Sequence, residues 1–148
     1  MRHIIITILM LGAFKSSYAC DCILYPVETY INKVDVIFTG TVIELVEKVD
    51  TTKFYNTPQN RKYFENKAYK VKVLIVERLK TGELKSDTVE FTSDFTNCDP
   101  IYELNEAYLF FANKAEGGKY KMAHCTRWGL LKDSQENIRK LKVELKIK

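Results

Sequence analysis

The chain has 148 residues, which fits one domain with a core large enough to fold alone. Hydrophobic residues make up 46% and charged residues 28%, as in an ordinary globular protein. The net charge is +4, but Arg2 and Lys15 lie in a segment that we expect to be removed, which leaves +2. A charge this small does not favour nucleic acid or an anionic membrane as a partner.

Residues 1–19 have the pattern of a secretory signal peptide. Arg2 precedes an apolar run over residues 4–14 that is too short to span a bilayer. Ser17-Tyr18-Ala19 places small residues three and one positions before Cys20, as signal peptidase requires. We therefore expect a mature domain of residues 20–148 that is secreted, periplasmic or exposed on a cell surface.

Two other interpretations of this segment remain open. An uncleaved anchor or a buried helix is the first. The second is a lipoprotein leader, in which Cys20 is acylated and the protein becomes a tethered envelope protein. Membrane contact is expected only in that second case.

The four cysteines, Cys20, Cys22, Cys98 and Cys125, all lie at or after the expected cleavage point. An even number of cysteines in a secreted chain predicts two disulfides. A Cys20–Cys22 bond would close a small strained ring. We therefore expect each of these two cysteines to join one of the two distant ones, which would pin a terminus that normally frays.

The first half of the predicted domain contains a helix and two long strands. Residues 26–33 favour a short helix with Pro26 in its first turn. Residues 34–46 are β-branched and aromatic and predict a strand, in which Gly40 indicates a bulge or a sharp coil. Residues 47–62 are polar and predict an exposed loop. Residues 63–79 predict a second strand with one solvent-exposed face.

The second half contains three shorter strands and a helix. A turn at Lys80-Thr81-Gly82 leads to predicted strands at 87–92 and 107–112, and Gly117-Gly118 turns into a last strand at 119–124. Asp133 or Ser134 would cap a final helix that carries three apolar residues on one face. Those residues are Ile138, Leu141 and Leu145.

Together, these predicted elements make a mainly β protein with about five strands in meander order and a helix at each end. Two strands are long enough to coil around a closed sheet. We therefore predict a five-stranded OB-fold (Greek-key) barrel with a short N-terminal helix, a C-terminal helix and two disulfides. A β-sandwich is the alternative, but it would require about seven strands.

The mature sequence holds no arrangement typical of catalysis. It contains one histidine, His124, which we interpret as a packed strand residue. No Ser-His-Asp set, zinc-ligand spacing or glycine-rich phosphate loop is present, and Asp94 with Asp99 is not read as a catalytic pair. We expect no enzyme and no cofactor of its own. For Cys20-Asp21-Cys22, disulfides are favoured over a thiolate metal site or a redox motif.

Several features of the chain follow one another in the order seen in a known protein family. They are the leader, Cys20-Asp21-Cys22, Pro26, the strand Val34 to Val42 and the later cysteines. Tyr69 to Val73 and Tyr108 to Ala112 continue this order over nearly all of the mature chain. The chain resembles the N-terminal, netrin-like domain of the tissue inhibitors of metalloproteinases, as a bacterial-type single-domain relative. That resemblance implies the pairings Cys20–Cys98 and Cys22–Cys125.

The resemblance also implies a function. In these inhibitors the free α-amine and carbonyl of the first cysteine chelate the catalytic zinc of a target metalloprotease, and the second residue enters the specificity pocket. Here Cys20, Asp21 and Cys22 would bind the partner, with the Cys20 amine and carbonyl on the partner's zinc and the Asp21 side chain in the pocket. Asp21 departs from the family, which usually has a small or hydroxylated residue there. A secreted zinc metalloprotease is thus the expected partner.

A non-inhibitory OB-fold binding module is the alternative function. Aromatic and basic residues gather in and after the polar loop: Tyr55, Tyr63, Phe64, Lys53, Arg61 and Lys62. They would form either an exposed contact surface or an ordinary solvated hairpin.

Overall fold

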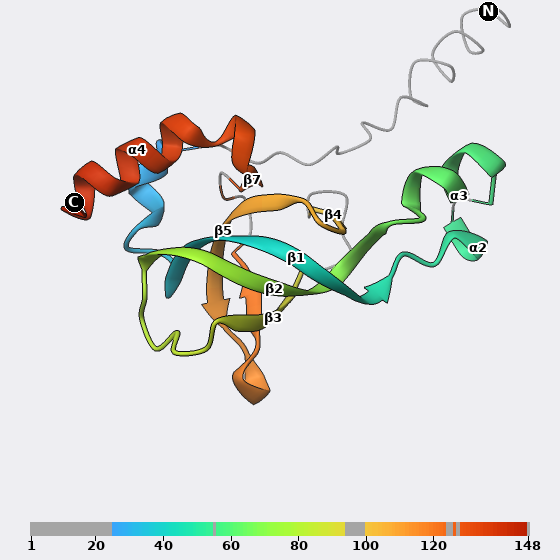
Figure 1. Cartoon of the computed structure of the whole chain (residues 1–148), viewed down its shortest axis with the longest axis horizontal. Coiled ribbons are helices and arrows are strands. Elements are labelled where there is room, and N and C mark those ends of the chain that lie inside the picture. The colour runs from blue at the N-terminus through green and yellow to red at the C-terminus, as the bar shows by residue number, and fades with distance from the viewer. Residues whose placement is uncertain (1–24, 55, 94–99, 124–125, 127, 148) are drawn as a thin grey trace, which may run out of the picture.

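The computed structural model describes residues 25–54, 56–93, 100–123, 126 and 128–147, and these form a mainly β protein (Figure 1). Five strands close a mixed barrel: β1 (Val36–Lys48), β2 (Lys67–Lys80), β3 (Thr88–Thr92), β5 (Ala107–Lys114) and β6 (Tyr120–Met122). Two short strands extend the sheet: β4 (Tyr102–Glu103) pairs with β2, and β7 (Gly129–Leu130) pairs with β5.

The barrel closes through two pairings between strands that are not consecutive. β1 pairs antiparallel with both β2 and β5, and β3 pairs with β6 in parallel. The predicted meander is therefore wrong at the closure, because a meander contains only antiparallel neighbours. The five predicted barrel strands themselves are confirmed. The sandwich alternative is excluded for the described residues, because their strands belong to one sheet.

Gly40 pairs with Ile75 at a point where β1 and β2 approach each other closely. The register of this pair shifts between Thr39 and Gly40, which confirms the predicted bulge. A Cβ atom on Gly40 would lie 2.5 Å from Val73 Cγ1 and 2.8 Å from the Leu74 carbonyl oxygen. Only glycine lets the two backbones approach this closely.

A Gly40→Ala variant is expected to lose about 2–3 kcal/mol of unfolding free energy, because the new methyl group meets backbone as well as a side chain. Gly117→Ala is the matched control. It has a positive φ of 71° but nothing within 4 Å of its Cβ position, so it should lose only about 1 kcal/mol. Urea unfolding of the two variants measures the difference, and equal losses would show that the close approach at Gly40 is not the constraint.

The barrel interior is filled by aromatic rings. Phe110 lies at the centre, with ring centroids 4.9 Å from Phe38, 4.8 Å from Phe91 and 5.5 Å from Tyr102. All four side chains are buried. Their T-shaped and stacked contacts add to the large apolar area that each ring removes from water.

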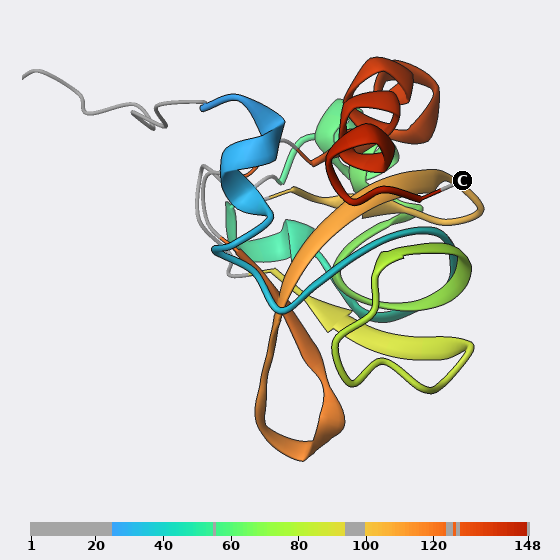
Figure 2. The ribbon, with the colours of Figure 1, turned by 90° about the vertical axis from the view of Figure 1, so that its left-hand side faces the viewer.

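A second apolar cluster lies outside the barrel. Its residues come from η1 (Val27–Tyr30), from α4 (Gln135–Glu144) and from the outward side of β1 and β5. The 3₁₀ helix η3 (Leu131–Asp133) directly precedes α4. Leu109 and Phe111 face this cluster while Tyr108 and Phe110 face the barrel interior. β5 is therefore apolar on both faces, which explains its unbroken hydrophobic sequence. Figure 2 shows η1 and α4 on the same side of the barrel.

The two end helices lie where the sequence predicts them, but their lengths and caps differ from the prediction. The predicted helix at 26–33 is a single 3₁₀ turn, with Pro26 just before it. α4 carries the predicted apolar face, since Ile138 and Leu141 are buried. Ser134 takes the N-cap position, but its hydroxyl donates to the Leu130 carbonyl (2.9 Å) instead of accepting from the helix backbone.

The predicted loop at 47–62 is instead an arm with two short helices. We call residues 48–67 the arm; it contains α2 (Thr51–Phe54) and α3 (Pro58–Phe64) and extends from the barrel between β1 and β2. β2 therefore begins at Lys67 and not at residue 63. Thr57 explains the change, because its hydroxyl accepts from the Asn60 backbone N–H (3.2 Å) and Pro58 follows in the first turn.

Candidate functional site

The predicted site residues Cys20, Asp21 and Cys22 lie outside the described residues. Cys98 and Cys125, their expected disulfide partners, do so as well. The described residues that flank these positions nevertheless have defined places in the fold. They show which end of the barrel each cysteine-bearing segment leaves or enters.

The parallel pairing of β3 and β6 brings two of those segments to one end of the barrel. Phe91 pairs with Tyr120, and Thr92 pairs with Lys121. Because the two strands run in the same direction, the chain leaves both at the same end. Cys98 follows the first strand in sequence, and Cys125 follows the second.

Hydrogen bonds from side chains hold the described ends of these two segments. The buried Ser93 hydroxyl donates to the Pro100 carbonyl (2.9 Å), and these residues flank 94–99. The Ser93 backbone N–H donates to the Tyr69 carbonyl (2.9 Å). The buried Thr126 hydroxyl donates to the Ala123 carbonyl (3.0 Å), across residues 124 and 125. The described residues on either side of each gap are thus joined by the hydroxyl group of a buried side chain.

A partly open groove of about 690 Å³ lies at this end of the barrel and runs along β6. Ala123 and Thr126, which flank Cys125, line it together with Tyr25, the first described residue. Other parts of its wall come from η1, β5 and β6: Tyr30, Asn113, Lys121 and Met122. The groove is therefore shared by the first described residue and by the two described residues that flank 124–125.

Tyr25 is held at the rim of this groove by two contacts. Its backbone N–H donates to the Tyr30 hydroxyl (3.1 Å), and the Lys33 ammonium lies 4.9 Å from the centroid of its ring. Tyr30 in turn packs edge-on against Phe111, with ring centroids 5.8 Å apart. These contacts hold Tyr25, the first described residue, against η1 and β5.

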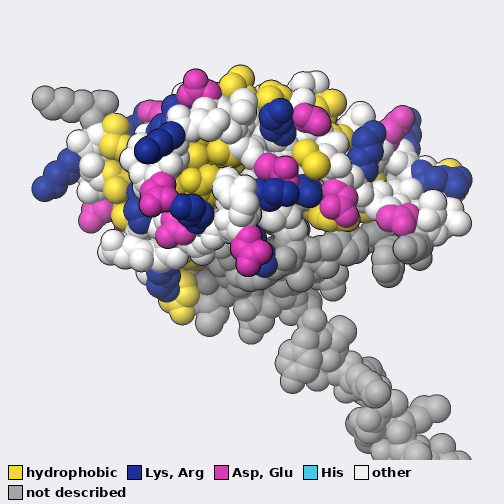
Figure 3. Space-filling model, turned by 90° about the horizontal axis from the view of Figure 1, so that it is seen from below, with side chains coloured by type: hydrophobic (Ala, Val, Ile, Leu, Met, Phe, Trp, Pro, Cys, Tyr) yellow, Lys and Arg dark blue, Asp and Glu magenta, His cyan; other side chains and the backbone are white. Residues whose placement is uncertain are grey.

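The electrostatics around the groove come from ion pairs at the surface. Lys114, which lines the groove, pairs with Glu83, and this hydrogen bond lowers the pKa of Glu83 and raises that of Lys114. The Lys119 ammonium lies 2.8 Å from Glu90 and lowers the pKa of that carboxyl group. Ionised pairs of this kind stabilise the fold weakly. In Figure 3, basic and acidic side chains are interspersed over the face shown.

The described residues contain no cluster of three or more His, Cys, Asp or Glu that could hold a metal ion. No helix within them is long and apolar enough to cross a membrane. His124, Asp94 and Asp99 lie outside the described residues, and so does Tyr55. Of the other residues predicted as a contact surface, Tyr63 is 61% exposed, whereas Phe64 is buried.

Comparison with known proteins places no further constraint on the site. No family model matches the sequence, and no curated protein matches it. What the fold defines is a small closed β-barrel domain of five strands.

The sequence did not reveal the groove residues Tyr25, Tyr30 and Lys33. Tyr25 and Tyr30 are five positions apart, and Lys33 reads as an ordinary exposed charge in a short helix. Their common place depends on the 3₁₀ turn of η1 and on how it packs against Phe111. The aromatic spacing was the one available signal, and it does not specify a site.

Proposed function

We propose that the protein is a secreted inhibitor of zinc metalloendopeptidases that resembles the N-terminal domain of the tissue inhibitors of metalloproteinases. The mature chain begins at Cys20, whose α-amine and carbonyl bind the catalytic zinc of the target. Disulfides Cys20–Cys98 and Cys22–Cys125 hold this end against the barrel.

One observation carries the proposal: three cysteine-bearing segments meet the described fold at one end of the barrel. β3 and β6 end side by side there, and Tyr25 lines the same groove as Ala123 and Thr126. Cys22 precedes Tyr25 by three residues, a span of at most about 11 Å. We therefore propose that Cys22 is bonded to Cys125, which lies between Ala123 and Thr126 in sequence.

The order in which the barrel strands pair supports our proposal that the barrel is an OB fold. In chain order, the first barrel strand pairs with the second and fourth, and the third is parallel to the fifth. An OB fold is a five-stranded Greek-key barrel. The fold alone does not establish an activity, which depends on the residues at the site.

The proposed chemistry requires only groups of the first residue. A catalytic zinc keeps one coordination position open for water or substrate. An α-amine has a pKa of about 8, so a useful fraction is neutral and able to bind the metal at neutral pH. Two disulfides would order the segment before it binds, which reduces the entropy lost in the complex.

Asp21 determines the kind of target. A carboxylate that enters an apolar specificity pocket pays a desolvation cost unless it meets a cation. We therefore propose a target whose specificity pocket contains a lysine or arginine. Such a pocket would pair with Asp21 while the Cys20 amine occupies the zinc.

The test is a titration of secreted zinc metalloendopeptidases with the exported protein and with a form that has one alanine added before Cys20. The added residue converts the α-amine to an amide and moves the new terminus off the zinc. We expect the unmodified protein to inhibit at least one protease that has a basic specificity pocket, and the extended form to lose inhibition by at least about a hundredfold.

An Asp21→Asn variant is the matched second change, because it keeps the free amine and removes only the charge. It should weaken inhibition of the protease with the basic pocket while preserving zinc contact. The proposal would be wrong if the extended protein inhibited as well as the unmodified one, or if no zinc protease in such a panel were inhibited.

A further inference from the structure

The arm forms a defined surface at the end of the molecule opposite to α4 and the loop between β2 and β3 (Figure 1). Near the start of the arm, the Asp50 carboxylate accepts hydrogen bonds from the Thr52 backbone N–H (2.9 Å) and hydroxyl (2.6 Å). Thr57 caps α3, and the Arg61 guanidinium donates to the Asn56 side-chain oxygen (3.0 Å). Hydrogen bonds within the arm thus link its described residues.

An exposed aromatic ring and a lysine are paired at the base of this face. The Lys67 ammonium lies 3.4 Å from the centroid of the Tyr63 ring, and Tyr63 packs edge-on against the buried Phe64 at 4.8 Å. Tyr63 remains 61% exposed despite these contacts. An exposed tyrosine near an arginine is a composition enriched at the centres of protein interfaces.

The arm, counted with the strand residues Lys48 and Lys67 at its base, has more basic than acidic residues, and Lys67 pairs with Glu103 (3.6 Å). It contains five basic residues, Lys48, Lys53, Arg61, Lys62 and Lys67, and two acidic residues, Asp50 and Glu65. Its net charge is therefore +3, whereas the rest of the predicted mature chain has 16 basic and 17 acidic residues, a net charge of −1. Among the described ion pairs, Arg61 and Lys62 have no carboxylate partner, and both are exposed.

We propose that the arm is a docking surface for an acidic segment of a protein partner, with Tyr63, Arg61 and Lys62 as its contacts. An Arg guanidinium binds a carboxylate through two parallel hydrogen bonds, and positive charge gathered at one end steers an acidic partner towards it. A membrane is less well matched. The five basic residues fall within the roughly 4–8 that adhesion to an anionic surface needs, but the net charge of the arm is only +3 and its described residues offer no apolar face to insert. Tyr63 is the one large hydrophobic side chain described as exposed on the arm.

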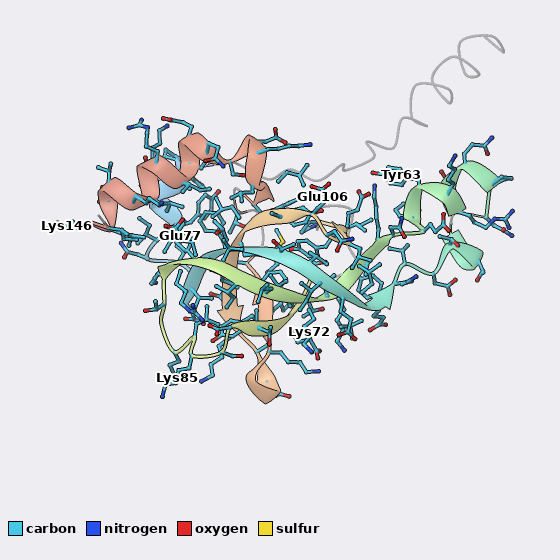
Figure 4. The ribbon with its side chains drawn as sticks, in the orientation of Figure 1. Tyr63, Lys72, Glu77, Lys85, Glu106 and Lys146 are labelled. Atoms are coloured by element: carbon cyan, nitrogen blue, oxygen red, sulfur yellow. The ribbon has the colours of Figure 1, made fainter. Side chains whose placement is uncertain are left out.

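The test measures binding of a fluorescein-labelled oligoglutamate peptide to the exported protein by fluorescence anisotropy. The arm variant is Arg61→Gln with Lys62→Gln. The matched control is Lys85→Gln with Lys146→Gln, which removes the same net charge at the other end of the molecule (Figure 4). Circular dichroism and thermal unfolding of both variants establish that each is folded.

We expect the arm variant to bind the peptide about tenfold more weakly and the control to bind like the unmodified protein. Tyr63→Ser should weaken binding by a further severalfold at unchanged net charge. Equal weakening by arm and control variants would overturn the proposal, because it would reduce the effect to overall charge. Binding to anionic lipid vesicles without binding to the peptide would overturn it in favour of a membrane. This test does not involve Cys20, so its result is independent of the proposed inhibition.

Discussion

A Phe110→Ala variant is expected to lose about 3–5 kcal/mol of unfolding free energy, a large part of the total of about 5–15 kcal/mol for a domain. Phe110 is 1% exposed and contacts Phe38, Phe91 and Tyr102 at the centre of the barrel. Its removal leaves a cavity between strands that lie on opposite sides of the barrel. Urea unfolding followed by far-ultraviolet circular dichroism measures the loss.

Tyr63→Ala is the matched control for removal of an aromatic ring. Tyr63 is 61% exposed, so its removal costs at most about 1 kcal/mol from the contacts with Lys67 and Phe64. A Phe110→Ala loss no larger than this would mean that the ring cluster does not stabilise the barrel.

The second large effect is expected at the cysteines, where each lost disulfide should cost about 2–5 kcal/mol. The two pairings that the sequence leaves open are distinguished by double variants. If Cys22 is bonded to Cys125, the Cys22→Ser/Cys125→Ser protein loses one bridge, and its unfolding free energy falls about as much as that of either single variant.

The double variant Cys22→Ser/Cys98→Ser would then lose both bridges and fall about twice as far. The opposite ranking of the two double variants would assign Cys22 to Cys98 and Cys20 to Cys125. Single variants as stable as the unmodified protein would show that the bridges are absent. Thermal unfolding with and without a reducing agent checks the same point independently.

The barrel strands were predictable because each has a local signature. Alternation along Val71, Val73 and Ile75 gave the inward face of β2, and Gly40 marked the bulge that coils β1 around it. The end helices were predictable from Pro26 and from the spacing of Ile138 and Leu141. These signals act over a few residues, so sequence patterns report them directly.

The closure of the barrel was not predictable in the same way. The parallel contact of β3 with β6 joins residues about 30 positions apart and has no local pattern. The arm was missed for a different reason. Its polar residues have the composition of a loop, whereas in the structure Thr57 and Pro58 are the N-cap and first-turn residues of α3.

The candidate site was also predictable only in its local features. The Cys20-Asp21-Cys22 motif is visible in the sequence, whereas its surroundings are not. That Tyr25, Ala123 and Thr126 line one groove depends on η1, β6 and their packing on β5. A motif identifies candidate chemistry, and only the fold indicates which distant residues it can reach.

The most direct test of the account is the intact mass and N-terminal sequence of the exported protein, measured with and without reduction and followed by peptide mapping. We predict a free Cys20 at the N-terminus, a mass lower by four hydrogens before reduction, and cross-linked peptides that join Cys20 to Cys98 and Cys22 to Cys125. Acyl chains on Cys20, a different N-terminus or unpaired thiols would contradict the claim that a stapled, free Cys20 is the functional end of this protein.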